Sequence, residues 1–394
     1  MNSLPVNSPE WLSKIILKKG GTISFYDYMN IVLNDSQNGF YGSGKANLGI
    51  NGDFVTSPSL SFDFSYFLSV QIEEWIEKIL EGSKSNTKLN LVEFGSGDGL
   101  LLKGILDYFL ENNKKILKNI SFIIIESNKG MKEKQIDNLK IFLEMEIDIK
   151  WIDLYELKDK SITGVIIANE VLDAFPVERI NYSKGEIYRK GVAINKRNGS
   201  LEYRKLKISS EIKEYINYAN QIGIQIPPRD VSEGWSTEIH IDTSSWLNMV
   251  NKKLKLGILL VIDYAIDSKK YYSVRRSEGT LLAYKDQKAY NDFLISPGNY
   301  DLTCHLCSDI LINQAKLNGF KFKGLIKQGE ALLSLGLAKE LSEIKNNLKN
   351  DLSKALLKRE SLLRLVDPLC LGDFKWFIFQ KSIYDLEINS RCIS

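Results

Sequence analysis

The segment Leu89–Leu100 places the strongest constraint on the fold of this chain. A short, mostly apolar run covers residues 89–94, and Gly95, Gly97 and Gly99 then stand at every second position. Apolar residues after the glycines recur at the three- and four-residue steps of a helix. A buried strand, a glycine turn and a helix predict an α/β fold with this turn at the carboxyl end of a strand, where ligands bind. Glycines let a ligand approach the main chain, and the helix start offers free N–H groups.

The spacing of the glycines separates two classes of ligand. A dinucleotide-binding turn reads Gly-x-Gly-x-x-Gly, but Leu100 stands at the position of its last glycine. The turn instead reads Glu93-x-Gly-x-Gly-x-Gly, which is the spacing found in methyltransferases that use S-adenosylmethionine (SAM). A tight turn in another kind of α/β protein stays open as an alternative.

The composition is that of an ordinary globular protein and argues only against a membrane-spanning protein. The 394 residues are 44% hydrophobic and 26% charged, which suits one large domain or two smaller ones. No stretch approaches the ~18 consecutive apolar residues of a membrane helix, so we expect no membrane span. A net charge of +3 gives no argument for a nucleic-acid partner, and we expect none.

The N-terminus and the cysteines bear on the cellular compartment. Residues 1–20 lack the layout of a signal peptide and contain no arginine, so they make no convincing transit peptide. Four cysteines in so long a chain do not form a disulfide framework. We therefore expect a cytoplasmic bacterial protein, or one of the mitochondrial matrix if its source is a eukaryote.

Further apolar runs alternate with helical segments and predict a parallel sheet with right-handed crossovers. Two of these runs end in an acid, Glu126 and Asp153, and a third ends in Asn169. A carboxylate at the end of the second strand can accept hydrogen bonds from both hydroxyls of a ribose. The predicted strands cover residues 121–125, 147–152, 164–169, 256–263, 320–326 and 374–380.

Polar residues directly follow the fourth predicted strand. Asn169, Glu170 and Asp173 would lie at the ligand-binding edge of the sheet, where buried charge is costly unless it has a partner or a function. The alternative is that Asp173 only caps the turn before Pro176. Spacing does not choose between the two.

Several segments outside the sheet have readable patterns. Residues 1–36 are expected to form helices, the second capped by Ser24. Residues 52–58 form a polar loop that either caps the long helix ending near residue 81 or lies over the glycine turn as a lid. Residues 39–46 imitate a phosphate-binding loop, which we reject because Ala46 replaces its hydroxyl residue and no strand precedes it.

We expect the domain organisation to follow these patterns. Residues 1–81 would form a helical segment with a cofactor-covering loop, and residues 82–394 the main domain. Residues 178–235, with short antiparallel strands and a helix, would be an insertion that shapes a substrate surface. A helical insertion would cover residues 330–366, and residues 267–301 read as a long irregular loop.

Cys304-x-x-Cys307 raises the question of a metal. Zinc needs four ligands, and the remaining two cysteines are solitary, so we expect small core residues and no metal. His305, one of two histidines, is either a base or a satisfied core residue.

Together these stretches resemble one family, the MidA-like SAM-dependent methyltransferases. Its mitochondrial members are arginine methyltransferases that assist assembly of respiratory complex I. The resemblance keeps the family order and spans nearly the whole chain. Its segments are residues 52–58, 93–99, 169–176, 262–264, 279–284, 301–305, 328–330 and 364–368.

The resemblance implies a Rossmann-like methyltransferase fold, SAM as cofactor and a protein substrate, with a respiratory-complex subunit as one candidate. Glutamate and glycines of the turn would receive the amino-acid end of SAM, Glu126 its ribose, and Asp153 would lie near adenine. Glu170 and Asp173 would orient an arginine guanidinium and offset its charge. The implied cofactor contacts are Glu93, Gly95, Gly97, Gly99, Glu126, Asp153, Asn169, Thr56, Ser57 and Pro58; the implied catalytic set is Glu170, Asp173, Asp53 and His305.

The chain departs from the usual family pattern at four positions: Ser59, Asp98, Ala265 and Cys307. The cofactor turn is intact, so the departures bear on substrate choice and turnover. A SAM-binding assembly factor without turnover and a small-molecule methyltransferase stay open. A nicotinamide oxidoreductase is disfavoured by Leu100, and a nucleic-acid methyltransferase by the absence of a Pro-Pro-aromatic motif after the fourth strand.

Overall fold

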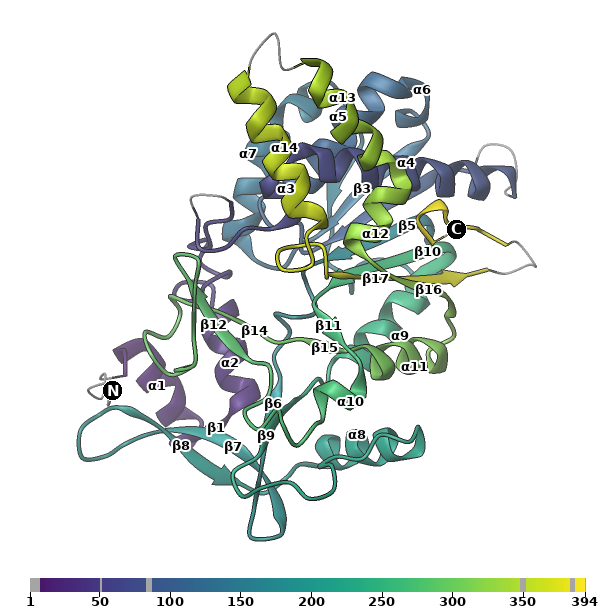
Figure 1. The fold of residues 1–394 in the computed structure, drawn as a ribbon. Coiled ribbons are helices and arrows are strands. Elements are labelled where there is room, and N and C mark those ends of the chain that lie inside the picture. The colour runs from purple at the N-terminus through teal and green to yellow at the C-terminus, as the bar shows by residue number, and fades with distance from the viewer. Residues whose placement is uncertain (1–7, 50–51, 83–86, 348–351, 383–386, 394) are drawn as a thin grey trace.

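The computed structural model describes residues 8–49, 52–82, 87–347, 352–382 and 387–393 (Figure 1). Two layered parts lie one above the other in Figure 1, with helices α4, α5 and α14 in the upper part and α1, α2 and α8 in the lower part. Within the described residues, no helix is both long and apolar enough to cross a membrane.

A seven-stranded sheet forms the centre of the upper part, in the order β16-β17-β10-β5-β2-β3-β4. The chain runs outward from β2 to β4 and then returns to β5 on the other side of β2, so the strand order reverses between β2 and β5. Such a reversal opens a crevice at the carboxyl ends of the strands. The strands are β2 (Leu89–Phe94), β3 (Ile120–Ile125), β4 (Ile149–Trp151), β5 (Ile162–Asn169), β10 (Leu254–Asp263), β16 (Lys321–Lys327) and β17 (Lys375–Lys381).

The sheet is mixed, which corrects the prediction of a wholly parallel one. Strand β17 is antiparallel to both of its neighbours, β10 and β16. The apolar pattern of a buried strand carries no information on its direction, so the sequence located this strand without orienting it. The predicted α/β class and the Rossmann-like arrangement are confirmed.

Helices cover both faces of this sheet. One face packs on α4 (Phe62–Glu81), α5 (Leu100–Asn112) and the later helices α12 (Gln328–Leu332), α13 (Ala338–Asn347) and α14 (Leu352–Val366). The other face packs on α9 (Thr243–Lys253) and α11 (Ser308–Leu317). The remaining helices of the upper part are α6 (Lys114–Leu117) and α7 (Lys129–Glu144), and a π-helical turn (Leu333–Leu337) joins α12 to α13. The predicted long helix ending near residue 81 is confirmed as α4.

The lower part is built around a second sheet, ordered β1-β7-β6-β9, with β8 paired to β7. The N-terminal strand β1 (Thr22–Ser24) joins it by pairing Ile23 with Val192, so the beginning of the chain and the 178–235 segment share one sheet. Its other strands are β6 (Glu178–Ser183), β7 (Glu186–Ile194), β8 (Leu201–Leu206) and β9 (Ser236–Ile239), and its helices are α1 (Glu10–Lys18), α2 (Phe25–Asn34) and α8 (Ser210–Gln221). The domain limits expected from the sequence stay a prediction.

Helix α2 begins where the sequence predicted. The Ser24 hydroxyl accepts a hydrogen bond from the Asp27 N–H at 3.0 Å, which satisfies one free donor of the first turn. Five residues on one side of α2 are buried in the core of the lower part, so its opposite side is held in a fixed position facing the upper part: Phe25, Tyr28, Met29, Val32 and Leu33.

Residues 267–301 are not one irregular loop, which corrects that prediction. The segment contains α10 (Ser268–Tyr271) and a hairpin of β12 (Leu282–Lys285) and β13 (Lys288–Tyr290), and β12 also pairs with β14 (Asp301–Thr303). Each strand is only three or four residues long, too short for an alternating pattern to stand out from the sequence. Two further short strands, β11 (Ala265–Ile266) and β15 (Leu306–Cys307), pair nearby.

Two glycines let the central strands of the upper sheet approach one another. A Cβ atom on Gly257 would lie 1.8 Å from the Gly164 carbonyl oxygen, and the φ angle of Gly257 is +145°. Gly257→Ala is therefore expected to lower the free energy of unfolding by about 3 kcal/mol or more, through strain and overpacking. Gly223→Ala is the matched control, since Gly223 also has a positive φ but open space around it.

Urea unfolding of both variants tests this expectation. The control should lose only about 1 kcal/mol, the cost of the positive φ alone. Equal losses in the two variants would show that the approach of β5 to β10 does not constrain this sheet.

Candidate active site

A cavity of about 520 Å³ opens where strands β2, β3 and β5 end. This size lies within the range of small-molecule sites. Its upper wall consists of the glycine turn and the residues after β3 and β5, and its lower wall comes from α2, β12 and β14. The cavity therefore lies between the two layered parts and is lined by both.

The glycine turn follows β2 and requires its glycines. Gly95 and Gly97 line the cavity, and both have φ near +55°. A Cβ on Gly97 would lie 2.8 Å from Leu48 Cδ1, and one on Gly95 would lie 3.1 Å from Val171 Cγ2. Gly99 has φ +87° and stands at the start of α5, behind the lining. A side chain at these positions would strain the turn, and at Gly95 and Gly97 it would also crowd a neighbouring side chain.

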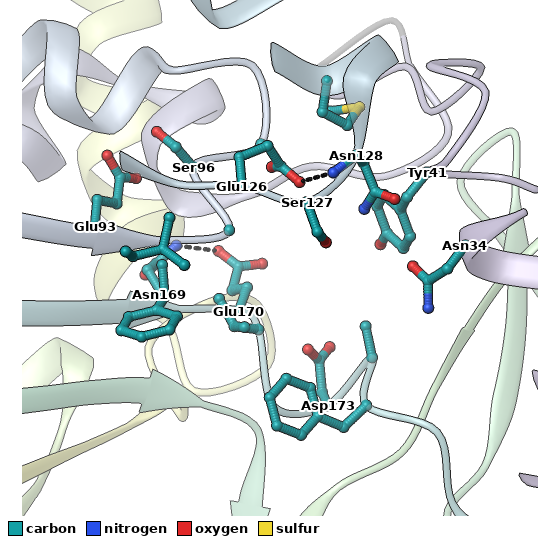
Figure 2. Close-up of a pocket in the computed structure, with 18 of the residues that line it drawn as sticks. Asn34, Tyr41, Glu93, Ser96, Glu126, Ser127, Asn128, Asn169, Glu170 and Asp173 are labelled. Atoms are coloured by element: carbon teal, nitrogen blue, oxygen red, sulfur yellow. Dashed lines mark hydrogen bonds between the residues drawn. The ribbon is translucent and has the colours of Figure 1, made fainter. Parts of the chain in front are cut away.

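Glu126, directly after β3, is held in place on both of its oxygens. Its Oε1 accepts the Asn128 N–H at 2.8 Å (Figure 2). Its Oε2 accepts the Gln135 side-chain N–H at 3.0 Å. Gln135 also donates to the Gly97 carbonyl at 2.9 Å and accepts from the Trp151 indole N–H. This glutamine thus fixes the distance between the predicted ribose-binding carboxylate and the glycine turn.

Asp263, at the end of β10, holds the turn after β5 in place through hydrogen bonds to its main chain. Its Oδ2 accepts the N–H groups of Leu172 at 3.0 Å and Asp173 at 3.2 Å, and its Oδ1 accepts the N–H of Tyr264 at 2.8 Å. Glu170 within the turn has φ +55°, a backbone conformation that side chains other than glycine rarely adopt. The turn presents Asn169, Glu170 and Asp173 to the cavity (Figure 2).

The loop at residues 56–58 caps a short helix and not the long helix α4, whose N-cap is Ser61; this corrects the predicted cap. Its role as a lid over the glycine turn stays a prediction. Thr56 and Ser59 form a reciprocal capping box at the start of the short helix α3 (Ser57–Leu60). The Ser57 N–H also donates to Glu170 Oε1 at 3.1 Å, and Thr56 and Pro58 line the cavity. Ser59, where the family usually has an acid, supplies the capping-box hydroxyl instead.

Sequence reasoning missed several residues that the lower part contributes to this cavity. A third carboxylate, Asp301, lies with Asp173 and Glu170, and the additional aromatic and amide side chains of the lower part are Tyr41, Tyr284, Asn30 and Asn34. Tyr264, which follows β10 of the upper part, was missed as well. Asp301 belongs to a segment quoted for the family resemblance, but its pattern gave it no role. Tyr41 contacts Asp301 across 260 residues of sequence, a separation that local patterns do not reveal.

Burial raises the pKa of all three carboxyl groups. The pKa of Glu170 rises to about 8 through burial and the nearby charge of Asp173. That of Asp301 also rises to about 8, for the same two reasons. The pKa of Asp173, whose side chain is 5% exposed, is raised by burial as well. At neutral pH this cluster therefore holds protons that exposed carboxylates would have lost.

The remaining predicted residues fall into two groups. Asp153 and Glu93 line the cavity, and burial raises the pKa of Glu93 to about 8. Asp53 and His305 are not among the lining residues; the Asp53 carboxylate accepts the Asn47 N–H, and the His305 ring lies 5.6 Å from that of Tyr264. Cys304 and Cys307 are buried, and within the described residues no cluster of His, Cys, Asp and Glu suits a metal ion.

The cavity has the features that SAM requires. Left-handed glycines expose main chain at one wall, an orientated carboxylate stands at the end of β3, and Asp153 follows β4. The Asn169 Oδ1 is buried, and no hydrogen bond reaches it from the residues that the structure describes. Such an atom is costly unless a ligand satisfies it.

Comparison with known families decides the assignment. Residues 69–326 match the family model described as "Putative S-adenosyl-L-methionine-dependent methyltransferase". The chain belongs to this family.

Individual relatives agree with this membership. A mitochondrial protein of Caenorhabditis elegans, named a protein arginine methyltransferase NDUFAF7 homolog, is 25% identical over 94% of this chain and 87% of its own length. The human protein of that name is 26% identical over 92% of this chain and 80% of its own. A crystal structure from Burkholderia thailandensis, bound to S-adenosyl-homocysteine, shares the fold with a TM-score of 0.82 at 24% identity, covering 100% of this chain and 98% of the other.

In this methyltransferase, the individual cofactor contacts stay predictions. Glu126 is the sharpest of them, because its geometry is fixed by Gln135. Glu126→Gln is expected to weaken S-adenosyl-homocysteine binding about tenfold, since it replaces an acceptor-only carboxylate with an amide at the ribose hydroxyls. Isothermal titration measures the affinity, and the control is Glu133→Gln, an exposed glutamate on α7, the helix that follows Glu126. Unchanged affinity in Glu126→Gln would remove the ribose assignment.

The carboxylate cluster makes stability depend on pH. Because the folded pKa of Asp301 lies above its unfolded value, the folded protein binds more protons between about pH 4 and 8, so the free energy of unfolding falls as pH rises through that window. Asp301→Asn should reduce this slope by up to about 1.4 kcal/mol per pH unit. Urea unfolding at pH 5, 6, 7 and 8 measures both slopes, and identical slopes would contradict the raised pKa.

Proposed function

We propose that this chain transfers a methyl group from SAM to an arginine side chain of a protein. The observation that carries the proposal is a group of three carboxyl groups in the same cavity as the glycine turn: the half-buried Glu170 and the buried Asp173 and Asp301. A guanidinium is a permanent planar cation with several donors, and carboxylates are its natural partners. The names of the curated relatives support the same substrate class.

Aromatic rings support a cationic acceptor as well. Tyr41, Tyr264 and Tyr284 line the cavity beside the carboxyl groups. The ring of Tyr264 is packed on Phe374, with 4.0 Å between ring centroids, so it has little freedom to move. Faces of such rings attract cations, and a rigid ring loses little entropy on binding.

The reaction requires an aligned acceptor and a base. When bound, SAM supplies a sulfonium methyl that an electron-rich nitrogen can attack. Carboxylates on two sides of a guanidinium would fix its plane and bring one nitrogen to near-attack distance. The positive charge of a bound guanidinium would favour the ionised form of Glu170, whose pKa is otherwise raised to about 8. Glu170 is then placed to take the proton that the nitrogen loses as the new N–C bond forms.

Glu170 is linked to the loop over the cavity. Its Oε1 accepts hydrogen bonds from the Ser57 N–H at 3.1 Å and the Asn169 side chain at 3.2 Å. These two donors orient the carboxylate and leave Oε2 for the acceptor. Asn169 and the 56–58 loop would in this way act on the reaction through Glu170.

Glu170→Gln and Asp173→Asn test the proposed chemistry. Each is expected to lower methyl transfer by about 10²-fold or more, while affinity for S-adenosyl-homocysteine changes less than about threefold. The assay incubates the enzyme with radiolabelled SAM and cell extract, then detects methylarginine after acid hydrolysis of the protein fraction. Exposed Glu133→Gln is again the control.

The alternatives have distinct outcomes in the same assay. SAM binding by the wild type without label transfer would favour an assembly factor without turnover. Label in an extractable compound would favour a small-molecule acceptor, and wild-type rates in both variants would reject the carboxylate mechanism.

The identity of the substrate protein and the cellular compartment of this chain are further parts of the proposal. We propose a protein target, with a subunit of a respiratory complex and a role in complex I assembly as the specific candidates. The curated relatives are named mitochondrial proteins. For this chain the corresponding candidates are the cytoplasm of a bacterium and the mitochondrial matrix of a eukaryote.

A further inference from the structure

The wall of the cavity that faces the methyltransferase sheet comes from the lower part of the fold. Figure 2 shows Tyr41 and Asn34 on one side of the cavity, opposite Glu93. Asp301 and Tyr284 belong to this wall, on paired strands β14 and β12, where they are register partners. None of these four side chains belongs to the glycine turn or to the strand ends that the cofactor motif predicts.

Among the described residues, one carboxyl oxygen of Asp301 accepts a hydrogen bond and the other has no hydrogen-bond partner. Tyr41 donates its hydroxyl hydrogen to Asp301 Oδ2 at 2.9 Å. The side chain is 2% exposed, and among the described residues no hydrogen bond reaches Asp301 Oδ1 or the buried Oδ1 of Asp173. Burying two carboxyl oxygens beside one cavity costs free energy when no hydrogen-bond donor reaches them. They therefore point to a ligand rich in N–H groups.

Two amides stand at the mouth of the same wall. Asn30 and Asn34 are exposed, lie one turn apart on α2, and line the cavity. The Asn34 amide N–H donates to Asn30 Oδ1 at 3.0 Å. This bond fixes the pair, whose remaining amide groups are the Asn34 oxygen, an acceptor, and the Asn30 nitrogen, a donor. One donor and one acceptor on a rigid helix match the C=O and N–H of a polypeptide main chain.

Resting on the proposed function, we propose that this wall is the acceptor subsite of the enzyme. Asp301 and Asp173 hold the guanidinium between them, and Asn30 and Asn34 hold the main chain of the polypeptide that carries it. The acceptor is therefore an arginine within a peptide chain, and free guanidines or free arginine are poor acceptors. Tyr41 is a positioning residue that orients Asp301.

Binding of a blocked tripeptide, acetyl-Gly-Arg-Gly-amide, tests the subsite. The protein is first saturated with S-adenosyl-homocysteine, and affinity is then measured by calorimetry. Two comparison probes are the citrulline tripeptide, which has the same shape without charge, and ethylguanidinium, which has the charge without a main chain. The arginine tripeptide should bind at least about tenfold more tightly than either, a difference of about 1.4 kcal/mol.

Variants assign the two halves of the subsite. Asp301→Asn keeps the volume and still accepts the Tyr41 hydroxyl, yet should weaken the arginine tripeptide about tenfold or more. Combined Asn30→Ala and Asn34→Ala should weaken the tripeptide about fivefold and leave ethylguanidinium unchanged. Asn220→Ala, exposed on α8, is the control. Affinity for S-adenosyl-homocysteine should stay constant in every variant, which also shows that each one folds.

The outcomes separate this inference from the function on which it rests. Suppose the wild type binds S-adenosyl-homocysteine but binds neither the arginine tripeptide nor ethylguanidinium more tightly than the citrulline tripeptide. Arginine is then not the acceptor, and the proposed function fails. If Asp173→Asn weakens the tripeptide but Asp301→Asn does not, the function stands and the Asp301 wall is wrong. Equal affinity of the wild type for tripeptide and ethylguanidinium would overturn the main-chain contact.

Discussion

The hydrogen bonds that Asp263 accepts hold together the reactive part of this protein. One carboxylate at the end of β10 receives three main-chain N–H groups, two from the turn after β5 and one from its own strand end. Because the turn carries both Glu170 and Asp173, its position sets where the carboxylates of the proposed mechanism stand relative to the glycine turn after β2. Burial raises the pKa of Asp263, and the neighbouring charge of Asp173 adds to that effect. Asp263 is thus a buried acid whose role is to hold the turn in place. Supporting groups of this kind are common where functional side chains must be preorganised.

The cofactor half of the site was readable from the sequence because its determinants are local. A strand, three glycines and a helix lie within residues 89–112, and Glu126 follows the next strand. Each of these features depends on neighbours a few residues away, and periodicity and glycine chemistry report such neighbours directly. The role of Ser24 as a helix cap was accessible for the same reason, whereas Thr56 caps the short helix α3, which the sequence analysis did not separate from α4.

The other half was not readable, because its determinants are contacts between distant segments. Tyr41 and Asp301 are far apart in sequence, and Tyr41 lies within the segment 39–46, whose glycines imitate a phosphate-binding loop. Strand β17 was located but not oriented, since direction is a property of the whole sheet. The hairpin of β12 and β13 was missed because its strands are too short to show a period. The segments of the family resemblance include Asp301 and most of β12, but neither Tyr41 nor β17, and they carry no positions in space.

The separation between local and distant determinants also orders the events of folding. The glycine turn, β2, α5 and β3 are neighbours in the chain, so they can associate early at a small cost in loop entropy. The wall with Tyr41 requires β1 to pair with β7 and β14 to reach across the rest of the protein, contacts of long sequence separation that form late. During synthesis, the chain would therefore acquire a place for the methyl donor before it acquires a means of choosing what to methylate. A molecule in which β12 and β14 have not yet paired beside Tyr41 would lack the proposed acceptor wall, so that pairing would add discrimination to cofactor binding.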